Sequence, residues 1–469
     1  MRRAACRTFS SARKINNAAA PSPPSPLQSL STQRQVNALL ASHSAYVLNT
    51  YARPSFIISH GKGMYLYDTQ SRQYLDFTAG IAVNALGHAD EGVAKVLAEQ
   101  ATQLVHCSNL IHHFWSGETA KLLIEETKKH GGLGIDPQNL EMERQLDVTE
   151  EALEIASSGL KVFFANSGTE ATEGALKFAR KYGKIIDPSG SKTEIVSFNE
   201  AFHGRSMGAL SVTHQKKYQD PFAPLVPGCV EAEFNSIESI NELITDKTCG
   251  VIVEPIQGEG GIMPANEEWL RALRKRCDEV NAVLIFDEIQ CGLGRTGKLW
   301  AHSYFPTDCH PDVITMAKPM ANGIPIGAIM MKDKVADVVK IGDHGTTFGG
   351  APLPTRVAHH VISRIAEPSF LSHVQQVASH LRARLDTLAS KYPSIVPSPV
   401  RGQGLMLGLP LANAQLPGKV VELCREKGVL FLSCGRNTLR FVPSLIVTEA
   451  EVDKATDVLD SVMAEVAKQ

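Results

Sequence analysis

The stretch Val313–Lys318, with the sequence VITMAK, predicts the fold more directly than any other part of the chain. It runs through apolar and β-branched residues to a single lysine, and the following stretch, Pro319–Gly327, contains the prolines and glycines that end a strand. A short apolar run bounded in this way is typical of a buried strand in a parallel sheet. Lys318 would then lie at the carboxyl edge of the sheet, where open α/β folds bind ligands.

Lys318 at such an edge has two interpretations. Removal from water disfavours the charged form and lowers the pKa of a lysine, so that its free amine becomes a nucleophile toward an aldehyde or ketone. The hypothesis is that Lys318 forms a Schiff base. The alternative is an ordinary lysine at a strand end, whose ammonium group extends into solvent. The residues that favour the first interpretation lie upstream.

The composition favours small-molecule chemistry. The chain has 469 residues, of which 43% are hydrophobic and 20% charged, so it can bury a large core. Because its length exceeds what a single hydrophobic core usually organises, we expect two structural domains. The 47 lysines and arginines nearly balance the 49 aspartates and glutamates, so the net charge does not suggest binding to nucleic acid or to an acidic lipid surface. The nine cysteines are spaced too widely for a disulfide framework or a CxxC metal site, which favours a reducing compartment.

The first 30 residues differ from the rest of the chain. Arg2, Arg3 and Arg7 occur among serines and alanines without an acid, and the proline-rich stretch Pro21–Pro26 follows. This composition is typical of a mitochondrial transit peptide and linker, and it lacks the apolar centre of a secretory signal. The alternative is a disordered basic tail. Because no later apolar stretch reaches the roughly 18 residues that cross a bilayer, we expect a soluble protein of the mitochondrial matrix.

Apolar runs alternate with helical patterns between about residues 60 and 330. Candidate strands are 162–165, 194–198, 251–254, 282–286, 313–317 and 328–331, and candidate helices are 91–104, 169–182, 237–244 and 267–280. Strands separated by helices imply crossover connections and a mainly parallel sheet. After about residue 350 we expect a long helix at 355–391, short strands at 405–409, 429–432 and 439–442, and a final helix from Glu449.

These patterns predict the domain boundaries. We expect the N-terminal part of a small domain in 31–80, a large domain in 81–349, and the C-terminal α+β part of the small domain in 350–469. Residues 131–157 are rich in Glu, Asp and Gly without a clear strand, and we assign them to a surface insertion.

Two motifs precede the lysine in loops that could hold a ligand. Ser167 and Glu170 have the spacing of a capping box at a helix start, where free N–H groups beside Gly168 and Thr169 suit a phosphate. Most capped helices bind nothing, however. The stretch Phe202–Arg205 (FHGR) offers a ring for a planar cofactor and a guanidinium for a carboxylate, or else is an ordinary surface turn.

Acidic residues follow two buried strands. Glu254 and Glu259 come after one strand, and burial is costly for such acids unless they find partners or lie on a solvated rim. Asp287 ends an almost fully apolar strand, which a cationic partner such as a protonated pyridine nitrogen would explain. Gln290 could then donate to a ring oxygen. The alternative is that Asp287 caps a helix at the strand end.

Two further motifs suggest rival chemistry. Gly292–Gly297 matches the GxGxxG fingerprint of dinucleotide-binding domains and is the basis of a dehydrogenase hypothesis. Residues 298–306 lack a helical period, however, and Asp287 would stand near the phosphates, so we interpret the glycines as a turn. A group of four residues invites a metal interpretation, but no second cluster completes a tetrahedral site, and we expect no metal. The four are His106, Cys107, His112 and His113.

Six motifs together, in the same order and at similar spacing, resemble the class III aminotransferases, which use pyridoxal 5'-phosphate. They are Ser167–Ala171 (SGTEA), Phe202–Arg205 (FHGR), Glu254–Glu259 (EPIQGE), Asp287–Gln290 (DEIQ), Ala317–Pro319 (AKP) and His344–Gly350 (HGTTFGG). The resemblance covers about residues 45–469. It implies the α/β fold of type I pyridoxal-phosphate enzymes, with a mostly parallel seven-stranded sheet in the large domain, a small α+β domain, and a homodimer with shared active sites.

The resemblance also implies roles for individual residues. Lys318 would bind the cofactor covalently and Asp287 would pair with its ring nitrogen, and these two are the expected catalytic residues. For the cofactor, the resemblance implies contacts of Gly168 and Thr169 with the phosphate, of Phe202 with the ring face and of Gln290 with the ring oxygen. Thr346 and Thr347 would reach the neighbouring subunit's site, where Thr347 would contact the phosphate. Arg205 and Arg440 would bind substrate carboxylates, and Glu259 would pair with Arg440.

Within the family, His203 and the stretch Ala79–His88 are more similar to members that act on N2-acetylornithine than to those that act on ornithine. The resemblance therefore implies transfer of the terminal amino group of N2-acetylornithine to 2-oxoglutarate, giving glutamate, in arginine biosynthesis. Succinylornithine, free ornithine and 4-aminobutyrate remain alternative donors. Thr172 and Ala351 depart from the asparagines that are usual in the family, which leaves a catalytically silent assembly subunit as a further alternative.

Overall fold

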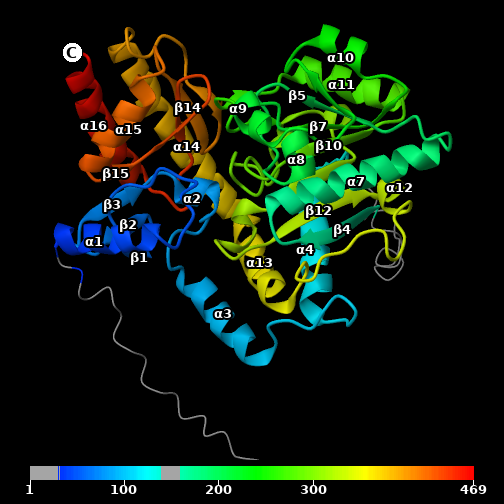
Figure 1. Ribbon diagram of the computed structural model, residues 1–469, viewed down its shortest axis with the longest axis horizontal. Coiled ribbons are helices and arrows are strands. Elements are labelled where there is room, and N and C mark those ends of the chain that lie inside the picture. The colour runs from blue at the N-terminus through cyan, green and yellow to red at the C-terminus, as the bar shows by residue number, and fades with distance from the viewer. Residues whose placement is uncertain (1–29, 31, 139–158, 469) are drawn as a thin grey trace, which may run out of the picture. The chain divides into compact units, whose positions relative to one another are not determined.

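The computed structural model describes residues 30, 32–138 and 159–468 (Figure 1). The described chain forms two compact units, one made of residues before Gly61 together with Tyr67–Arg72, and the other made of Gly61–Leu66 and the chain from Gln73 onward. In the first unit, helix α1 (Gln33–Ser44) is capped by Thr32, whose hydroxyl accepts a hydrogen bond from the Gln35 amide. The predicted transit peptide falls almost entirely outside the described residues.

Seven strands form the main sheet of the second unit, in the order β4, β12, β11, β10, β7, β5, β6. Their bounds are β4 (Leu160–Ala165), β12 (Gly327–Lys332), β11 (Val313–Met316), β10 (Val283–Asp287), β7 (Thr248–Val253), β5 (Glu194–Phe198) and β6 (Cys229–Ala232). All neighbours pair in parallel except β12, which is antiparallel to both β11 and β4. The mostly parallel seven-stranded sheet that the sequence predicts is confirmed.

Successive side chains of a strand point to opposite faces of the sheet, so these strands contribute residues to two separate hydrophobic cores. On one face, a set of strand residues packs with the buried alanines of helix α7 (Gly168–Ile186), which crosses the sheet in Figure 1. That set includes Ile195, Ile252, Ile285 and Val313. Their neighbours along the strands, including Val196, Val253, Phe286 and Ile314, belong to the core on the other face. Strands buried on both faces read as continuous apolar runs, which is why the sequence predicted them well.

Further helices lie before residue 337. They are α2 (Ala79–Ala82), α3 (Glu91–Gln103), α4 (Phe114–His130), α8 (Met207–Ser211), α9 (Lys216–Gln219), α10 (Ile237–Leu243), α11 (Glu267–Glu279) and α12 (Asp333–Ala336). Of these, α4, α10, α11 and α12 contact strands of the main sheet. Helix α4 and the edge strand β6 were not predicted from the sequence. The helix expected at 355–391 is two helices, α13 (Pro352–Ile365) and α14 (Pro368–Lys391). Pro368 starts the second, because proline lacks the N–H that would continue the first.

The C-terminal part carries a second sheet in the order β13, β14, β17, β16. These strands are β13 (Arg401–Gln403), β14 (Met406–Pro410), β17 (Thr438–Phe441) and β16 (Leu432–Cys434). Helix α15 (Leu416–Glu426) packs against β16 and β17, and α16 (Glu449–Val466) packs against α14 and α15. Strand β15 (Val429–Leu430) pairs in parallel with β3 (Gln73–Asp76). The remaining strands are β1 (Ile58–Lys62), β2 (Tyr65–Asp68), β8 (Ile256–Gln257) and β9 (Met263–Pro264).

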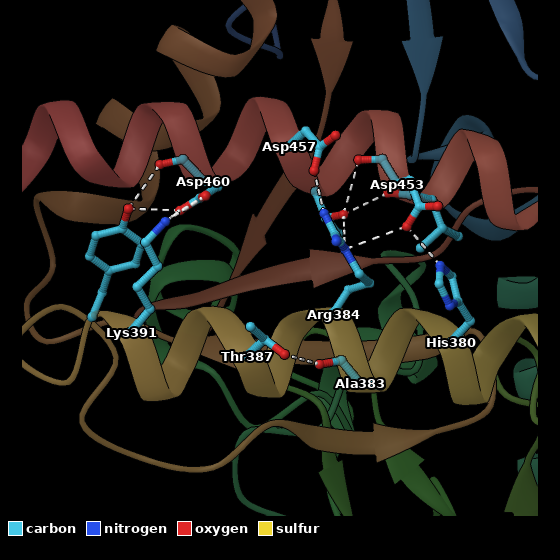
Figure 2. A network of polar contacts seen from close by, with 11 residues as sticks. His380, Ala383, Arg384, Thr387, Lys391, Asp453, Asp457 and Asp460 are labelled. Carbon is cyan, nitrogen blue, oxygen red and sulfur yellow. Dashed lines mark hydrogen bonds and ion pairs between the residues drawn. The ribbon is translucent and has the colours of Figure 1, made fainter.

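Helices α14 and α16 lie side by side and are joined by a row of ion pairs (Figure 2). His380 and Arg384 contact Asp453, Arg384 also contacts Asp457, and Lys391 contacts Asp460. These side chains are partly exposed, so each pair contributes little to stability.

The predicted domain boundaries at residues 80 and 349 stay predictions. The surface assignment of 131–157 needs correction at its start, because Leu133 is buried and its amide donates to the His302 ring. Residues 139–158 of that insertion lie outside the described chain. None of the described helices is long and apolar enough to cross a membrane.

Candidate active site

The carboxyl edge of the main sheet gathers the residues that the sequence singled out. Asp287 ends β10 and stands in register with Thr315 of β11, so that Lys318 follows just beyond the end of the neighbouring strand. Glu254 follows β7, and the loop of Phe202–Arg205 follows β5. Because these strands are parallel, their following loops meet at one edge, as the fold class requires.

Lys318 is half-buried at this edge, and its amine is the part that is enclosed by protein. No hydrogen bond or ion pair joins its side chain to any other residue that the structure describes. Removal from water, and after it the nearby Arg440 guanidinium, lower the pKa of the Lys318 amine, although Asp287 and Glu254 oppose the shift. An amine with a lowered pKa is available as a nucleophile at neutral pH.

Asp287 is almost fully buried and is held by His203. Its Oδ1 accepts a hydrogen bond from the Ile289 amide at 3.0 Å, and its Oδ2 lies 2.7 Å from His203 Nδ1. The His203 ring is also buried, and its Nε2 has no partner in the described chain. The loop that carries His203 is fixed by Thr172, whose hydroxyl donates to the His203 carbonyl at 3.0 Å. Thr172, one of the two departures from the family pattern, therefore supports the site.

Glu254 is buried beside this pair and accepts two backbone hydrogen bonds, from the Phe202 and Gly258 amides, each at 2.9 Å. Burial, and secondarily the Asp287 carboxylate, raise the pKa of Glu254 to about 7, although His203 opposes the shift. Glu254 thus fixes both loops that border the site, and it lies close enough to the cluster to couple to its charge.

The N-terminus of α7 forms a second part of the site. Ser167 caps the helix, and its hydroxyl accepts the Glu170 amide. The amides of Gly168 and Thr169 have no hydrogen-bond partner among the described residues, and the Thr169 hydroxyl lies 2.6 Å from that of Ser206. Gly204 has a φ of 138°, and a Cβ there would lie 2.3 Å from Thr169 Oγ1. This close approach leaves free N–H groups and two hydroxyls at a helix start, which is a suitable arrangement for a phosphate.

Phe202 and Arg205 lie together with Tyr218, which belongs to none of the sequence motifs. The Arg205 guanidinium carbon is 5.5 Å from the Phe202 ring centroid and 3.6 Å from that of Tyr218. The two rings meet edge to face at 5.9 Å. Arg205 is exposed, and its side chain forms no hydrogen bond or ion pair within the described chain. Its guanidinium is therefore oriented by rings while its donors stay free for a carboxylate.

Arg440 is buried on β17 and has two partners. Its Nη2 lies 3.4 Å from Glu259 Oε2, and its Nη1 donates to Gln290 Oε1 at 3.4 Å. Gly258 makes room for Gln290, since a Cβ there would lie 2.4 Å from Gln290 Oε1. The Glu259 carboxylate also accepts a hydrogen bond from the Tyr218 hydroxyl at 3.2 Å.

Thr346 and Thr347 are not joined to this cluster by any hydrogen bond in the described chain. Thr346 accepts hydrogen bonds from Asn166 Nδ2 at 2.8 Å and from the Gly349 amide at 3.0 Å. Thr347 is exposed. Ala351, the other departure from the family pattern, is the N-cap of α13 and offers no side-chain cap, so that its effect falls on helix stability.

The rival motifs have structural explanations. Gly292–Gly297 forms turns and opens no helix, and Arg295 in it donates to the Leu405 and Pro443 carbonyls. Glu288 accepts hydrogen bonds from the Ala301 and His302 amides and from the His302 ring, which ties down the segment after the turns. Within residues 30, 32–138 and 159–468, no group of three or more His, Cys, Asp and Glu side chains could hold a metal ion.

Comparison with known proteins identifies the family. Residues 46–463 match the model of "Aminotransferase class-III". The chain belongs to the class III aminotransferase family. It is 50% identical over 422 residues to the mitochondrial acetylornithine aminotransferase of Neurospora crassa, covering 90% of this chain and 86% of that protein. It is 48% identical over 435 residues to the protein of the same name from Yarrowia lipolytica, covering 93% and 98%.

Solved structures of other class III aminotransferases share the fold. The N-acetylornithine aminotransferase of Stenotrophomonas maltophilia is 31% identical with a TM-score of 0.72, covering 91% of this chain and 100% of that one. The ornithine aminotransferase of Toxoplasma gondii is 28% identical with a TM-score of 0.81, covering 94% and 97%. The type I fold expected from the sequence is confirmed, and the chain is a pyridoxal-phosphate-dependent aminotransferase that acts on small molecules.

The residues present fit pyridoxal phosphate. The free amides and hydroxyls at the start of α7 suit its phosphate, the unpaired Lys318 amine suits its aldehyde, and the Asp287 carboxylate suits a protonated ring nitrogen. When bound, this cofactor supplies an aldehyde that accepts amino groups and a ring that takes up the electrons released at the reacting carbon.

Sequence reasoning missed three contributors to the site. Tyr218 and Ser206 lie outside the motifs, and neither residue type carries a signal by itself at those positions. The contact of His203 with Asp287 joins residues 84 positions apart. His203 was visible in its motif, but only the parallel sheet shows that the motif faces Asp287.

Proposed function

We propose that this class III aminotransferase moves the terminal amino group of N2-acetylornithine to 2-oxoglutarate, giving N-acetylglutamate semialdehyde and glutamate. The observation that carries the proposal is the pair of arginines, one exposed with free donors and one buried behind Glu259. The similar proteins named acetylornithine aminotransferase, at 41% to 50% identity, support this donor. Ornithine or 4-aminobutyrate is the alternative donor within the same family.

Each residue has a stated task in this proposal. Gly168 and Thr169 hold the cofactor phosphate, Phe202 covers its ring, and Gln290 contacts the ring oxygen. Asp287 keeps a proton on the ring nitrogen, because an adjacent carboxylate favours the charged form. Lys318 anchors the cofactor and, as a free amine, takes and returns the proton at the reacting carbon of the substrate.

The two substrates present different carboxylates to the arginines. N2-acetylornithine carries one carboxylate far from its reacting carbon, and Arg205 binds it through two parallel hydrogen bonds. Glutamate carries a distal carboxylate for Arg205 and another beside the reacting carbon, which Arg440 binds. During the first half-reaction Glu259 keeps Arg440 paired, because an unpaired buried charge is costly, and it moves aside for glutamate.

A homodimer with shared active sites completes the proposal. Several large apolar side chains are exposed in one stretch of the chain and in the loop of Thr347, with Leu110 94%, Ile111 62%, Phe114 66% and Phe348 61% exposed. A patch of this kind marks an interface in a soluble protein. In the dimer Thr346 and Thr347 would serve the neighbouring subunit's site, with Thr347 at the phosphate.

The proposed location is the mitochondrial matrix. The relatives from Neurospora crassa and Yarrowia lipolytica are named mitochondrial, and residues 1–30 have the composition of a transit peptide. Arginine biosynthesis is the proposed pathway.

The test is a comparison of donors. The holoenzyme is assayed with N2-acetylornithine, N2-succinylornithine, ornithine and 4-aminobutyrate at fixed 2-oxoglutarate, and kcat/KM is measured for each. N2-acetylornithine should exceed ornithine by at least about tenfold, because the unacylated ammonium enters uncompensated beside Arg205. Equal or better use of ornithine or 4-aminobutyrate contradicts the donor assignment and leaves the aminotransferase class intact.

A further inference from the structure

Tyr218, on the short helix α9, contacts both halves of the carboxylate-binding apparatus. Its ring lies under the Arg205 guanidinium, and its hydroxyl donates to Glu259, which in turn pairs with Arg440. Among the described residues it is the side chain that joins the exposed arginine to the partner of the buried one. The proposed function gives it no task.

The ring of Tyr218 determines how Arg205 is presented. Arg205 has no hydrogen bond or ion pair within the described chain, so its direction depends on packing against aromatic rings. The Tyr218 ring is the nearer of the two, at 3.6 Å against 5.5 Å for Phe202. A planar guanidinium held flat on a ring keeps its edge donors free, which is the geometry that binding a carboxylate through two hydrogen bonds requires.

The hydroxyl of Tyr218 acts on the other arginine through Glu259. The two Glu259 oxygens have different partners, Oε1 with Tyr218 and Oε2 with Arg440. A carboxylate fixed at one oxygen loses less freedom when the other oxygen meets a cation. The hydrogen bond therefore favours the state in which Glu259 covers Arg440. An incoming α-carboxylate must then displace Glu259 while Tyr218 holds it in place.

We propose that Tyr218 is a specificity-determining positioning residue, whose ring orients Arg205 for both substrates and whose hydroxyl holds Glu259 on Arg440 against dicarboxylates. The inference rests on the proposed function, which assigns substrate carboxylates to Arg205 and Arg440. Tyr218 thereby weakens the binding of glutamate-like dicarboxylates and protects Arg440 while a donor with one carboxylate is bound.

The hydroxyl is tested with Tyr218→Phe, which keeps the ring. The probe is glutarate, an unreactive five-carbon dicarboxylate, titrated into the holoenzyme to give a dissociation constant. Loss of one hydrogen bond to a charged acceptor should tighten glutarate binding by about fivefold. In half-reactions, kcat/KM for 2-oxoglutarate should rise relative to that for the donor, while kcat stays within about twofold. Unchanged or weaker glutarate binding overturns this part of the proposal.

The ring is tested with Tyr218→Leu. The probe is N-acetylnorvaline, which has the acetylated amino-acid end of the proposed donor and no terminal amine. Its dissociation constant should rise by about fivefold in Tyr218→Leu, because the Arg205 guanidinium loses its platform, and should stay within about twofold in Tyr218→Phe. Equal effects of the two variants on this probe overturn the separation of ring from hydroxyl.

Two controls keep the outcomes interpretable. Tyr182→Phe removes a hydroxyl from a tyrosine of α7 that packs on the sheet, and it should leave both dissociation constants unchanged. Lys217→Gln removes the other cation near the Tyr218 ring, 4.6 Å from its centroid, and should do the same. If the unaltered enzyme binds glutarate but not N-acetylnorvaline, the donor assignment has failed, and the glutarate comparison still decides the role of the hydroxyl.

Discussion

The two edges of the main sheet each carry a buried aspartate with lysines nearby, and they differ in how those charges are paired. At the amino edge, Asp312 accepts hydrogen bonds from Arg274, Lys334 and the Leu284 amide, and Lys332 lies 3.8 Å away. At the carboxyl edge, Asp287 has only the Ile289 amide and His203, and Lys318 has no partner in the described chain. The same residue types thus occur in a complete network and in an incomplete one.

The difference separates structural charges from functional ones. Burial alone would raise the pKa of Asp312, but the Arg274, Lys334 and Lys332 cations more than offset burial and lower it. A carboxyl held in this way is charged at every physiological pH and has no capacity left for a ligand. Lys318 shows the opposite pattern, because burial lowers the pKa of its amine without a full counter-charge. Buried charged side chains that lack full pairing at one edge of the sheet, while those at the other edge are fully paired, indicate a functional site.

The largest effect is expected from Lys318→Ala at the carboxyl edge. Activity should fall by at least about 10⁴-fold, because both the anchor of the cofactor and the proton-transfer group are removed. The free energy of unfolding of the apoprotein should stay the same or rise, since a poorly compensated buried amine is lost. Steady-state assays and urea unfolding of the apoprotein measure the two quantities. Near-normal turnover would refute the role of Lys318.

Asp287→Asn should lower kcat by about 10³-fold, because the ring nitrogen loses its counter-charge. The variant should unfold within about 1 kcal/mol of the unaltered protein, because the amide oxygen can still accept from the Ile289 amide and the amide nitrogen can donate to His203 Nδ1 in the neutral tautomer that carries its hydrogen on Nε2. The check combines kcat at saturating cofactor with urea unfolding. Rates unchanged at saturating cofactor, or a loss of stability that equals that of Asp312→Asn, would erase the contrast between the edges.

Asp312→Asn should show the reverse pattern. It leaves Arg274 buried without its main counter-charge, which costs about 3 kcal/mol of unfolding free energy. The folded fraction should keep its kcat/KM within about twofold, because the change lies at the edge away from Lys318. Urea unfolding and active-site-normalised kinetics provide the measurements. A specific loss of kcat without a loss of stability would show that the amino edge also serves catalysis.

His310 makes the amino edge sensitive to acid. Burial, and after it the neighbouring His302, lower the pKa of His310 to about 3, and its Nδ1 accepts the Gly134 amide. The folded state therefore binds fewer protons than the unfolded state, so that stability is full above the unfolded pKa near 6.5 and is lost as pH falls toward 3. By pH 5 the loss from this residue is about 2 kcal/mol. His310→Gln should flatten the profile of unfolding free energy against pH between 6.5 and 5, and parallel profiles would contradict this origin.

The smallest effect is expected on the α14–α16 seam of Figure 2. Arg384→Gln removes contacts to Asp453 and Asp457, yet these groups are partly exposed, so unfolding free energy should fall by less than about 1 kcal/mol. The difference should shrink further in molar salt, where exposed charges are screened. A cost as large as that of Asp312→Asn would mean that burial does not explain the contrast between paired charges.

The sequence predicted those parts of the fold in which burial dominates. Strands buried on both faces, such as β10 and β11, were found almost to the residue because nothing but an apolar run can occupy such positions. The edge strand β6 was missed, because only one of its four residues is buried and the exposed Glu231 interrupts its apolar run. Helix α4 was also missed, and its buried residues include Thr119 and Thr127, which an apolar pattern does not detect. The antiparallel direction of β12 could not be predicted, because the amino-acid composition of a buried strand does not depend on its direction.

The site was predictable where a motif ends a strand and unpredictable where loops meet. Asp287 and Lys318 follow directly from strand ends, and the parallel order of β10 and β11 brings them together. The contact of Tyr218 with Glu259 joins positions 41 residues apart, one on the short helix α9 and the other in the loop after β8, and no periodicity in the sequence indicates it. Contacts of that kind depend on loop conformation, which local sequence specifies only weakly.

The antiparallel strand β12 has a consequence for the order in which the chain assembles. Strand β4 lies at the end of the main sheet, and its neighbour there is β12, which begins at Gly327. A growing chain that has reached only residue 326 therefore contains β4 and α7 but not the strand that pairs with β4. More than 160 further residues must be synthesised after Val162 and Phe164 before the residues of β12 that pair with them exist. A gap of that length makes the first half of the chain dependent on protection from unwanted strand pairing until β12 arrives.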